Sequence, residues 1–305
     1  MANSPIVSSL PKYVDQQRLP LIGKSVLGAK TARLLTLQTG VKSQAALNLV
    51  NVDIKFGNGL ACGWNEAGAT TLSQRVITVG HPKVNMAFCE KALLDKWAGY
   101  EVRVAADEHA LPFEEEFMEI ISENIAAIVE KAIWQGDTTS DDVNLNKFDG
   151  MLKILDGEAT VIDETIAAGS TYRAAVSQVL LAIPDAAIAK DTVIFASPEF
   201  VRGYGQELVA ANLYHYEAGK DAEDFVIPAS NVKLIAVAGL AGKSKLVAGR
   251  LSNMYYGTDM LGDEEKFEFW YSQDNREFRL AVEFASGVQV AFPDQIVVGS
   301  YTTLA

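Results

Sequence analysis

The sequence predicts an α+β protein, and three patterns in its 305 residues support that class. Apolar residues recur at steps of three and four between residues 112 and 135, as on one face of an α-helix. Between residues 46 and 80, apolar and polar residues alternate before a glycine-rich stretch and a second strand-like run follows it, as in a long β-hairpin. Residues 155–255 mix helix and strand patterns, and strand-like runs return after residue 266. This length suggests one large domain or two modest ones.

The long helix is predicted over residues 112–135, which contain no internal proline or glycine. Its apolar face would consist of Phe113, Phe117, Ile120, Ile121, Ile125, Ile128, Val129, Ala132 and Ile133. Glu114, Glu115 and Glu116 lie near its start, where carboxylates favour the positive end of the helix dipole. Gly136 would end the helix in a left-handed conformation. At about 1.5 Å per residue the helix would be about 35 Å long, and we interpret it as a strut that supports strands.

The hairpin is predicted over residues 46–80. Val50, Val52, Ile54 and Phe56 alternate with polar residues in its first arm, and a second strand-like run covers residues 72–79. An isolated two-stranded hairpin is marginally stable in water. We therefore expect this hairpin to lie on a surface, either of its own chain or of a neighbouring copy.

Two further segments flank these elements. Residues 1–45 mix prolines with short apolar pieces and predict an extended arm, part of which should be docked because it contains several leucines. Residues 86–97 have the apolar spacing of a helix, which Gly99 would close.

Residues 155–255 predict an inserted α/β unit. A linker is expected at 159–169, helices at 171–183 and 198–211, and strands at 192–196, 232–238 and 246–251. Ser197 and Pro198 have the residue types of a helix cap and first turn. The segment 239–244 resembles a phosphate-binding loop but has two residues between its glycines where that loop has four. A hairpin turn is the favoured interpretation of this segment.

The terminal section predicts an antiparallel meander. Strand-like runs cover residues 266–271, 278–284 and 288–292, and their alternation leaves one apolar face. The long helix is the natural partner of that face.

The residue pattern predicts no catalytic, cofactor or metal site. The candidates considered are His81, His109, His215, Cys62, Cys89, Asp259, Asp263, Glu264 and Glu265. The histidines share no metal-ligand spacing, the cysteines form no CxxC pair, and the acidic residues do not match a calcium loop. An α/β enzyme that binds a small molecule in residues 155–255 remains a less favoured alternative.

Composition argues against several other classes of protein. The net charge of −13 disfavours a protein that grips nucleic acid over its whole surface. No apolar run approaches the roughly 20 residues that span a bilayer, and the N-terminus lacks the layout of a signal peptide. Two cysteines fit a reducing compartment.

The order of these parts resembles a tailed-phage major capsid protein of the HK97 fold. The residues that carry the resemblance are AIWQGD at 132–137 and KFDGML at 147–152, between the long helix and the inserted unit. The resemblance implies an N-terminal arm (1–45), an extended loop (46–80), a peripheral domain (81–154 and 256–305) with a spine helix (112–135), and an axial domain (155–255).

The resemblance also implies a function. Such a subunit self-assembles as hexamers and pentamers into the icosahedral shell around the double-stranded DNA of a tailed bacteriophage, and it is made in the host bacterial cytoplasm. Its partners would be its own copies, a portal, possible decoration proteins and a separate scaffolding protein, since only about 45 residues precede the hairpin. DNA would be enclosed without sequence-specific binding, and no membrane or cofactor is expected. An encapsulin-type nanocompartment shell is the nearest alternative.

Charge suggests which residues join neighbouring copies. We predict that Lys55 and Arg75 on the hairpin face Glu114, Glu115 and Glu116 on the spine helix of a neighbour. No partner for a covalent cross-link through Lys55 stands out in the terminal strands, so self-cross-linking is not expected.

Overall fold

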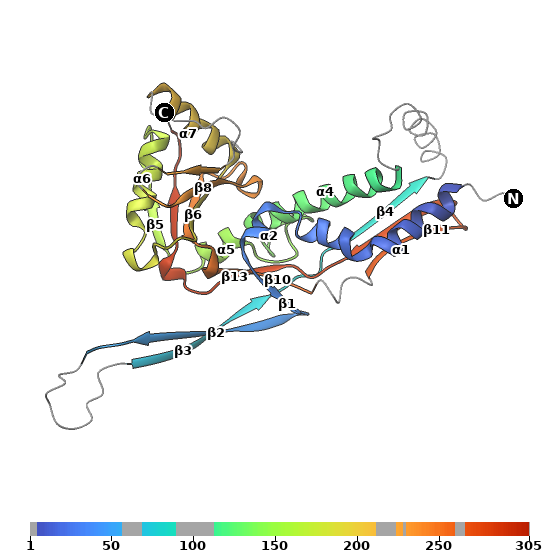
Figure 1. The fold of residues 1–305 in the computed structure, drawn as a ribbon, viewed down its shortest axis with the longest axis horizontal. Helices are drawn as coiled ribbons and strands as arrows, with labels where there is room; N and C mark the ends of the chain where they lie inside the picture. Colours follow the sequence, from blue (N-terminus) through green and yellow to red (C-terminus); the bar gives the residue numbers. More distant parts are fainter. Residues whose placement is uncertain are drawn as a thin grey trace.

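The computed structural model describes residues 5–56, 69–89, 113–211, 224–227, 230–259 and 266–304. Figure 1 shows an elongated molecule with an α/β unit at one end, a long helix above an antiparallel sheet at the other, and a projecting hairpin. Several predictions lie outside the described residues. They concern Cys62, His109, His215, Asp263, Glu264, Glu265, the hairpin tip and the segment 90–112.

The N-terminal segment is helical, so the prediction of an extended arm is wrong for most of it. Helices α1 (Pro5–Val26) and α2 (Lys30–Leu34) precede the short strand β1 (Thr36–Thr39). Two helical pieces meet in α1 at a kink at Gln17, and Pro20 falls in the first turn after it. A missing N–H in a first turn removes no helical hydrogen bond. The expected docking is present, because α1 packs against the long helix and buries Leu10, Leu21 and Ile22.

The predicted hairpin is present. Strands β2 (Gln44–Asp53) and β3 (Ala69–Thr78) pair antiparallel over their whole length. The end nearest the body is buried: Leu47, Ile77 and Val79 form a small apolar cluster with Val41 and Ala285. The hairpin therefore has a packed root and, farther out, arms that project from the body (Figure 1).

Glycines allow the hairpin root to approach the body closely. A Cβ on Gly80 would lie 2.0 Å from the carbonyl oxygen of Lys147, and one on Gly287 would lie 2.3 Å from that of Thr78. Any side chain at either position would push the backbones apart. The two glycines therefore fix where the hairpin leaves the body.

The predicted terminal meander is only partly correct. Strands β11 (Phe267–Ser272) and β12 (Glu277–Glu283) pair as expected, but their third partner is β4 (Lys83–Cys89). The expected third strand, β13 (Gly287–Val290), instead pairs with β10 (Met254–Thr258), whose other neighbour is β1. The helix predicted to begin at residue 86 is wrong over residues 86–89, because the whole of β4 pairs with β12.

The long helix α4 (Phe113–Gln135) is present and buries most of its predicted face. Its Phe117 ring lies 5.1 Å from that of Phe88 on β4, which joins the helix to the sheet. Ile120 and Ile128 are exposed, so the predicted apolar face was too wide. Met118 and Trp134, which the prediction omitted, are fully buried.

The end of α4 is closed by a backbone contact. The positive-φ glycines of the described chain are Gly40, Gly169 and Gly242, so the predicted left-handed conformation of Gly136 is wrong. The N–H of Gly150 donates to the carbonyl of Gly136 at 2.8 Å, and a Cβ on Gly136 would lie 2.5 Å from the carbonyl oxygen of Phe148. Glycine is required here because two chain segments touch.

The inserted α/β unit is a six-stranded sheet flanked by helices. Its elements are β5 (Ile162–Thr165), α6 (Tyr172–Ala182), β6 (Thr192–Ala196), α7 (Pro198–Ala210), β7 (Asp224–Val226), β8 (Lys233–Ala236), β9 (Lys245–Arg250) and β14 (Val297–Ser300). Helix α5 (Met151–Asp156) precedes the unit and packs against α4 and β13. The strand order is β5-β14-β9-β6-β8-β7. Short 3-10 turns occupy Asp185–Ala187, Ala238–Leu240, Leu251–Asn253 and Pro293–Gln295. Ser197 caps α7 as predicted, because its side chain accepts from the N–H of Phe200 at 3.2 Å.

Three expectations about this unit are corrected. The expected linker 159–169 contains β5. Strands β8 and β9 lie on either side of β6, so segment 239–244 between them is a crossing connection and not a hairpin turn. Strand β14 from the terminal section pairs with β5 and β9, which places it in this sheet and not with the peripheral elements.

Candidate assembly surfaces

The outer arms of the hairpin expose several apolar side chains. Val50 and Leu72 lie directly opposite each other across β2 and β3, and 57% and 75% of their surfaces are exposed. Ile54 and Phe56 continue the exposed apolar surface towards the tip. Contiguous exposed apolar surface in a soluble protein commonly marks a contact site. The hairpin therefore has the character of an interface that lacks its partner in a single copy.

The spine helix α4 carries a second exposed apolar surface. Ile120 is 51% exposed and Ile128 is 43% exposed, and the two lie eight residues apart, so they share one side of the helix. Asn124 lies between them, and its side chain donates to the carbonyl of Ile120 at 2.8 Å. We name this strip, Ile120, Asn124 and Ile128, the outer spine face.

Arg75 has a partner within its own chain. Its guanidinium forms an ion pair with the carboxylate of Glu158, which follows α5. The two side chains are 21% and 31% exposed. The sequence-based prediction considered only carboxylates of a neighbour, because nothing in the local pattern marks Glu158 as close to the hairpin.

The remaining predicted contact residues are not brought together within one copy. Lys55 is exposed on the hairpin, whereas Glu115 and Glu116 lie at the start of α4 and the side chain of Glu114 is outside the described set. In Figure 1 the start of α4 lies at the right end of the body, whereas the hairpin leaves the body below its middle and projects away to the lower left. Contact between Lys55 and these glutamates would therefore require a second copy.

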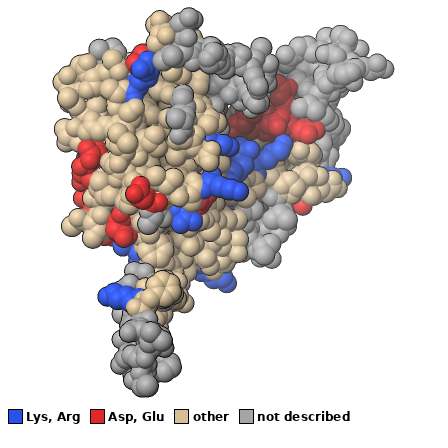
Figure 2. All heavy atoms as spheres, turned by 60° about the vertical axis from the view of Figure 1, so that its left-hand side comes forward, with Lys and Arg blue, Asp and Glu red and all other residues tan. Residues whose placement is uncertain are grey.

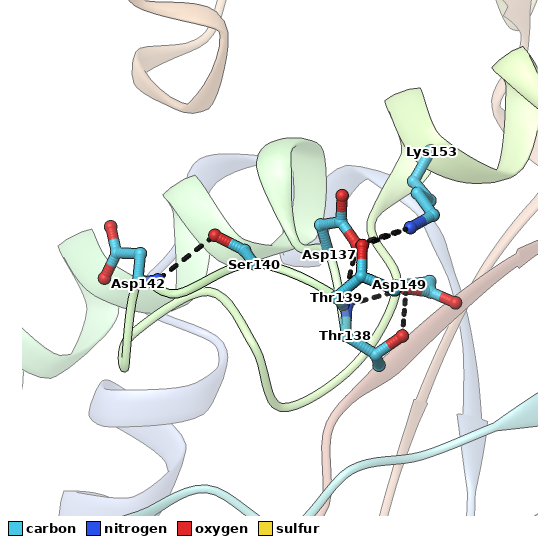
Figure 3. Close-up of polar contacts among 7 residues, drawn as sticks. All are labelled: Asp137, Thr138, Thr139, Ser140, Asp142, Asp149 and Lys153. Carbon is cyan, nitrogen blue, oxygen red and sulfur yellow. Dashed lines mark hydrogen bonds and ion pairs between the residues drawn. The ribbon is translucent and has the colours of Figure 1, made fainter.

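A polar network fixes the loop that follows the spine helix (Figure 3). Asp137 accepts from the N–H and hydroxyl of Thr139 at 2.8 and 2.6 Å and pairs with the ammonium of Lys153. The carboxylate of Asp149 accepts from the N–H and hydroxyl of Thr138, both at 2.9 Å. The loop is therefore tied to α5, which lies beside the hairpin root.

The network makes a testable prediction about acid stability. Hydrogen bonding to Lys153 and Thr139 lowers the pKa of Asp137 from 3.8 to about 2. Because the folded-state pKa is lowered, the stabilisation by the ionised carboxylate is complete above pH 3.8 and is lost as the pH falls through about 2. We expect Asp137→Asn to lower the thermal midpoint at pH 6, and the difference from the wild type to shrink between pH 4 and pH 2. A difference that stays constant with pH would contradict this role.

A cavity of about 1080 Å³ lies between α1, α2, α4 and α7. Its lining combines cations and carboxylates: Lys24 pairs with Glu119 at 3.1 Å, and the buried Glu130 accepts from the N–H of Thr31 at 2.9 Å. Figure 2 shows Lys and Arg side chains gathered beside Asp and Glu in the middle of one face. The lining of the cavity therefore carries both positive and negative side chains, and it is not a site of purely positive or purely negative charge.

The residues considered as metal ligands or nucleophiles do not gather into a site within the described chain. No group of three or more His, Cys, Asp or Glu side chains there could hold a metal ion. Cys89 is an exposed free thiol. Among the described helices, none combines the length and apolar character needed to cross a bilayer.

No protein-family model and no curated protein sequence matches the chain. Solved structures do match it. The satellite phage P4 procapsid, which includes the size determination protein, matches with TM-score 0.58 and 11% identity over 96% of this chain and 92% of that chain. The capsid of an empty GTA particle matches with TM-score 0.59 and 10% identity over 92% and 90%. A virus-like particle from Pyrococcus furiosus matches with TM-score 0.55 and 8% identity over 95% and 100%.

These comparisons establish the fold. The matches extend over at least nine tenths of this chain and of each matched chain, so the fold is shared over nearly the whole chain. The chain is an α+β protein with the HK97-like capsid fold.

Proposed function

We propose that this chain is the major capsid protein of a tailed bacteriophage, a shell subunit without catalytic activity or cofactor. The observation that carries the proposal is the apolar hairpin surface, which stays exposed in a chain whose fold matches shell proteins over nearly its whole length. A second copy is the partner that would cover this surface. The hairpin of one copy would lie on the outer spine face of the next.

Such a contact is heterologous, because it joins two different surfaces of the same chain. Heterologous contacts form rings when the rotation between copies closes. We propose that the rings are hexamers and pentamers that tile an icosahedral shell around double-stranded DNA. A separate scaffolding protein, a portal and possible decoration proteins would complete the particle, which would form in the cytoplasm of the host bacterium.

The outer spine face supplies a direct test. Ile120→Asp and Ile128→Asp should each reduce the yield of particles about tenfold or more, because every copy in a shell repeats the damaged contact. Both residues are exposed, so the free energy of unfolding should change by less than about 0.5 kcal/mol. Particle yield is measured by sedimentation and electron microscopy, and stability by urea unfolding. Ile128→Leu is the matched control. Normal yields of both aspartate variants would contradict the proposed contact.

A nanocompartment shell of the encapsulin type is the second candidate. It is favoured by the match to the Pyrococcus furiosus particle, which covers that whole chain. The content of purified particles distinguishes the two functions. Nuclease-protected DNA supports the phage capsid, and an enclosed protein without nucleic acid supports the nanocompartment.

A further inference from the structure

Polar contacts also hold the root of the hairpin, in addition to the close backbone contacts at Gly80 and Gly287 and the apolar cluster. The side chain of Gln289 on β13 donates to the carbonyl of Val76 at 2.8 Å. One residue outward along β3, Arg75 forms its ion pair with Glu158. Farther out on the same face of β3, Ser73 is exposed, whereas Ile77 on the inner side is buried. The ion pair therefore lies near the point where the hairpin changes from packed root to projecting arm.

We propose that the Arg75–Glu158 pair is a latch that sets the direction in which the hairpin leaves the body. The inference rests on the proposed function, since the hairpin direction matters only if a neighbouring copy must receive it. In this role Arg75 and Glu158 are positioning residues. They act within one copy and prepare the hairpin for contact with the next.

The length of the hairpin makes its direction important. From residue 75 to residue 69, β3 extends about 20 Å at about 3.3 Å per residue. A rotation of about 10° at the root would move the far end of that segment by about 3–4 Å. Packed interfaces have the density of protein interiors and do not tolerate displacements of this size. A fixed root therefore matters more for assembly than for folding of the body.

The chemistry of the pair suits a directional contact. Arginine presents a planar fork of donors, so its pairing with a carboxylate restricts geometry more than a lysine pair does. The Nε atom of Arg75 is buried and has no partner among the described residues. Arg75 also lies opposite the buried Leu47 across the hairpin. Apolar packing and the ion pair therefore act on the same segment of the root.

Charge exchange tests the latch in the full-length chain. Arg75→Glu and Glu158→Arg should each reduce particle yield about tenfold or more, and the double exchange should restore most of it. Because the pair is partly exposed, the thermal midpoint of each variant should change by less than about 3 °C. Exchange of the exposed pair Lys83 and Glu283 on the peripheral sheet is the matched control. Normal assembly of Glu158→Arg would overturn the proposal.

The same variants distinguish the latch from pairing between copies. If Arg75 instead contacts a neighbour's spine helix, Glu115→Arg or Glu116→Arg would rescue Arg75→Glu, and Glu158→Arg would not. That result would also overturn the latch. The latch is supported if Glu158→Arg restores the particle yield of Arg75→Glu and neither Glu115→Arg nor Glu116→Arg does.

A measurement on unassembled protein separates the latch from the proposed function. Spin labels at Thr71 on the hairpin and Asp163 on β5, with both native cysteines replaced by serine, report the hairpin direction. We expect one narrow distance distribution in the labelled parent, a broad one in each single variant, and a narrow one again in the double exchange. Unchanged distributions in the single variants would refute the latch. Failure of the parent chain to form particles would refute the proposed function. The distance measurement would still test the latch, because it uses unassembled protein.

Discussion

Removing the outer hairpin, residues 50–72, and joining Leu49 to Ser73 through an Asn-Gly turn should abolish particle formation while the body stays folded. Leu49 and Ser73 lie opposite each other in the register, and Asn-Gly favours the two-residue turn that closes such a pair. The deletion leaves the root cluster of Leu47, Ile77 and Val79 in place. It removes the exposed apolar arms, which on this account contribute little to the single copy and most of the contact with the next.

The deletion is judged by two measurements. The far-ultraviolet circular dichroism and cooperative melting of the body should persist, and particle yield should fall below about one hundredth of the wild type, because one contact per copy is lost around every ring. A chain with Thr70→Ser and Thr71→Ser keeps the arms and is the control. Abundant closed particles of the deleted chain would contradict the account.

Trp134→Ala should have the largest effect on stability. Trp134 is 0% exposed, its indole N–H donates to the hydroxyl of Thr31 at 2.8 Å, and its ring lies 5.0 Å from that of Phe195 on β6. A Cβ on Gly239 would lie 2.3 Å from the indole ring. The side chain therefore joins three parts of the chain: α2, the spine helix and the α/β unit.

We expect Trp134→Ala to lower the free energy of unfolding by about 3–5 kcal/mol, because a cavity remains where three elements met. Trp134→Phe keeps an aromatic ring and loses the hydrogen bond to Thr31, so a smaller loss of about 1–2 kcal/mol is expected. Urea unfolding followed by circular dichroism measures both values. A loss below about 1 kcal/mol for Trp134→Ala would show that the three parts are not coupled through this residue.

The elements with strong local patterns could be predicted from the sequence. The spine helix has a continuous apolar periodicity over residues 113–135, and the hairpin has an alternating first arm, a glycine-rich stretch and a second strand-like run. Ser197 followed by proline marked the start of α7. In these cases the local preference and the tertiary environment favour the same structure.

Elements that depend on distant partners could not be predicted. Residues 86–89 were assigned to a predicted helix, but they belong to β4, which pairs along its whole length with β12, nearly 200 residues later. Strand β14 is four residues long and joins a sheet whose other strands precede it. Proline concealed the helix at Pro20, because the kink at Gln17 places that proline in a first turn.

The candidate contact residues illustrate the same limit. Periodicity placed Arg75 on the hairpin, but its carboxylate partner is 83 residues away, in a segment with no visible relation to the hairpin. Ile120 and Ile128 were assigned to the core because a periodic pattern does not show how much of a helix surface its neighbours cover. The predicted contacts of Lys55 with Glu114, Glu115 and Glu116 concern a second copy and stay a prediction.

The central claim is that each copy of this chain covers the exposed apolar hairpin surface of a neighbouring copy. Sedimentation velocity of the purified chain over a range of concentrations, with electron microscopy of the same samples, tests it most directly. The account predicts rings of several copies, or closed shells of megadalton mass, that grow at the expense of the single copy as concentration rises. A chain that stays a 33.0 kDa monomer at every concentration, with a molecular crowder added as well, would contradict it.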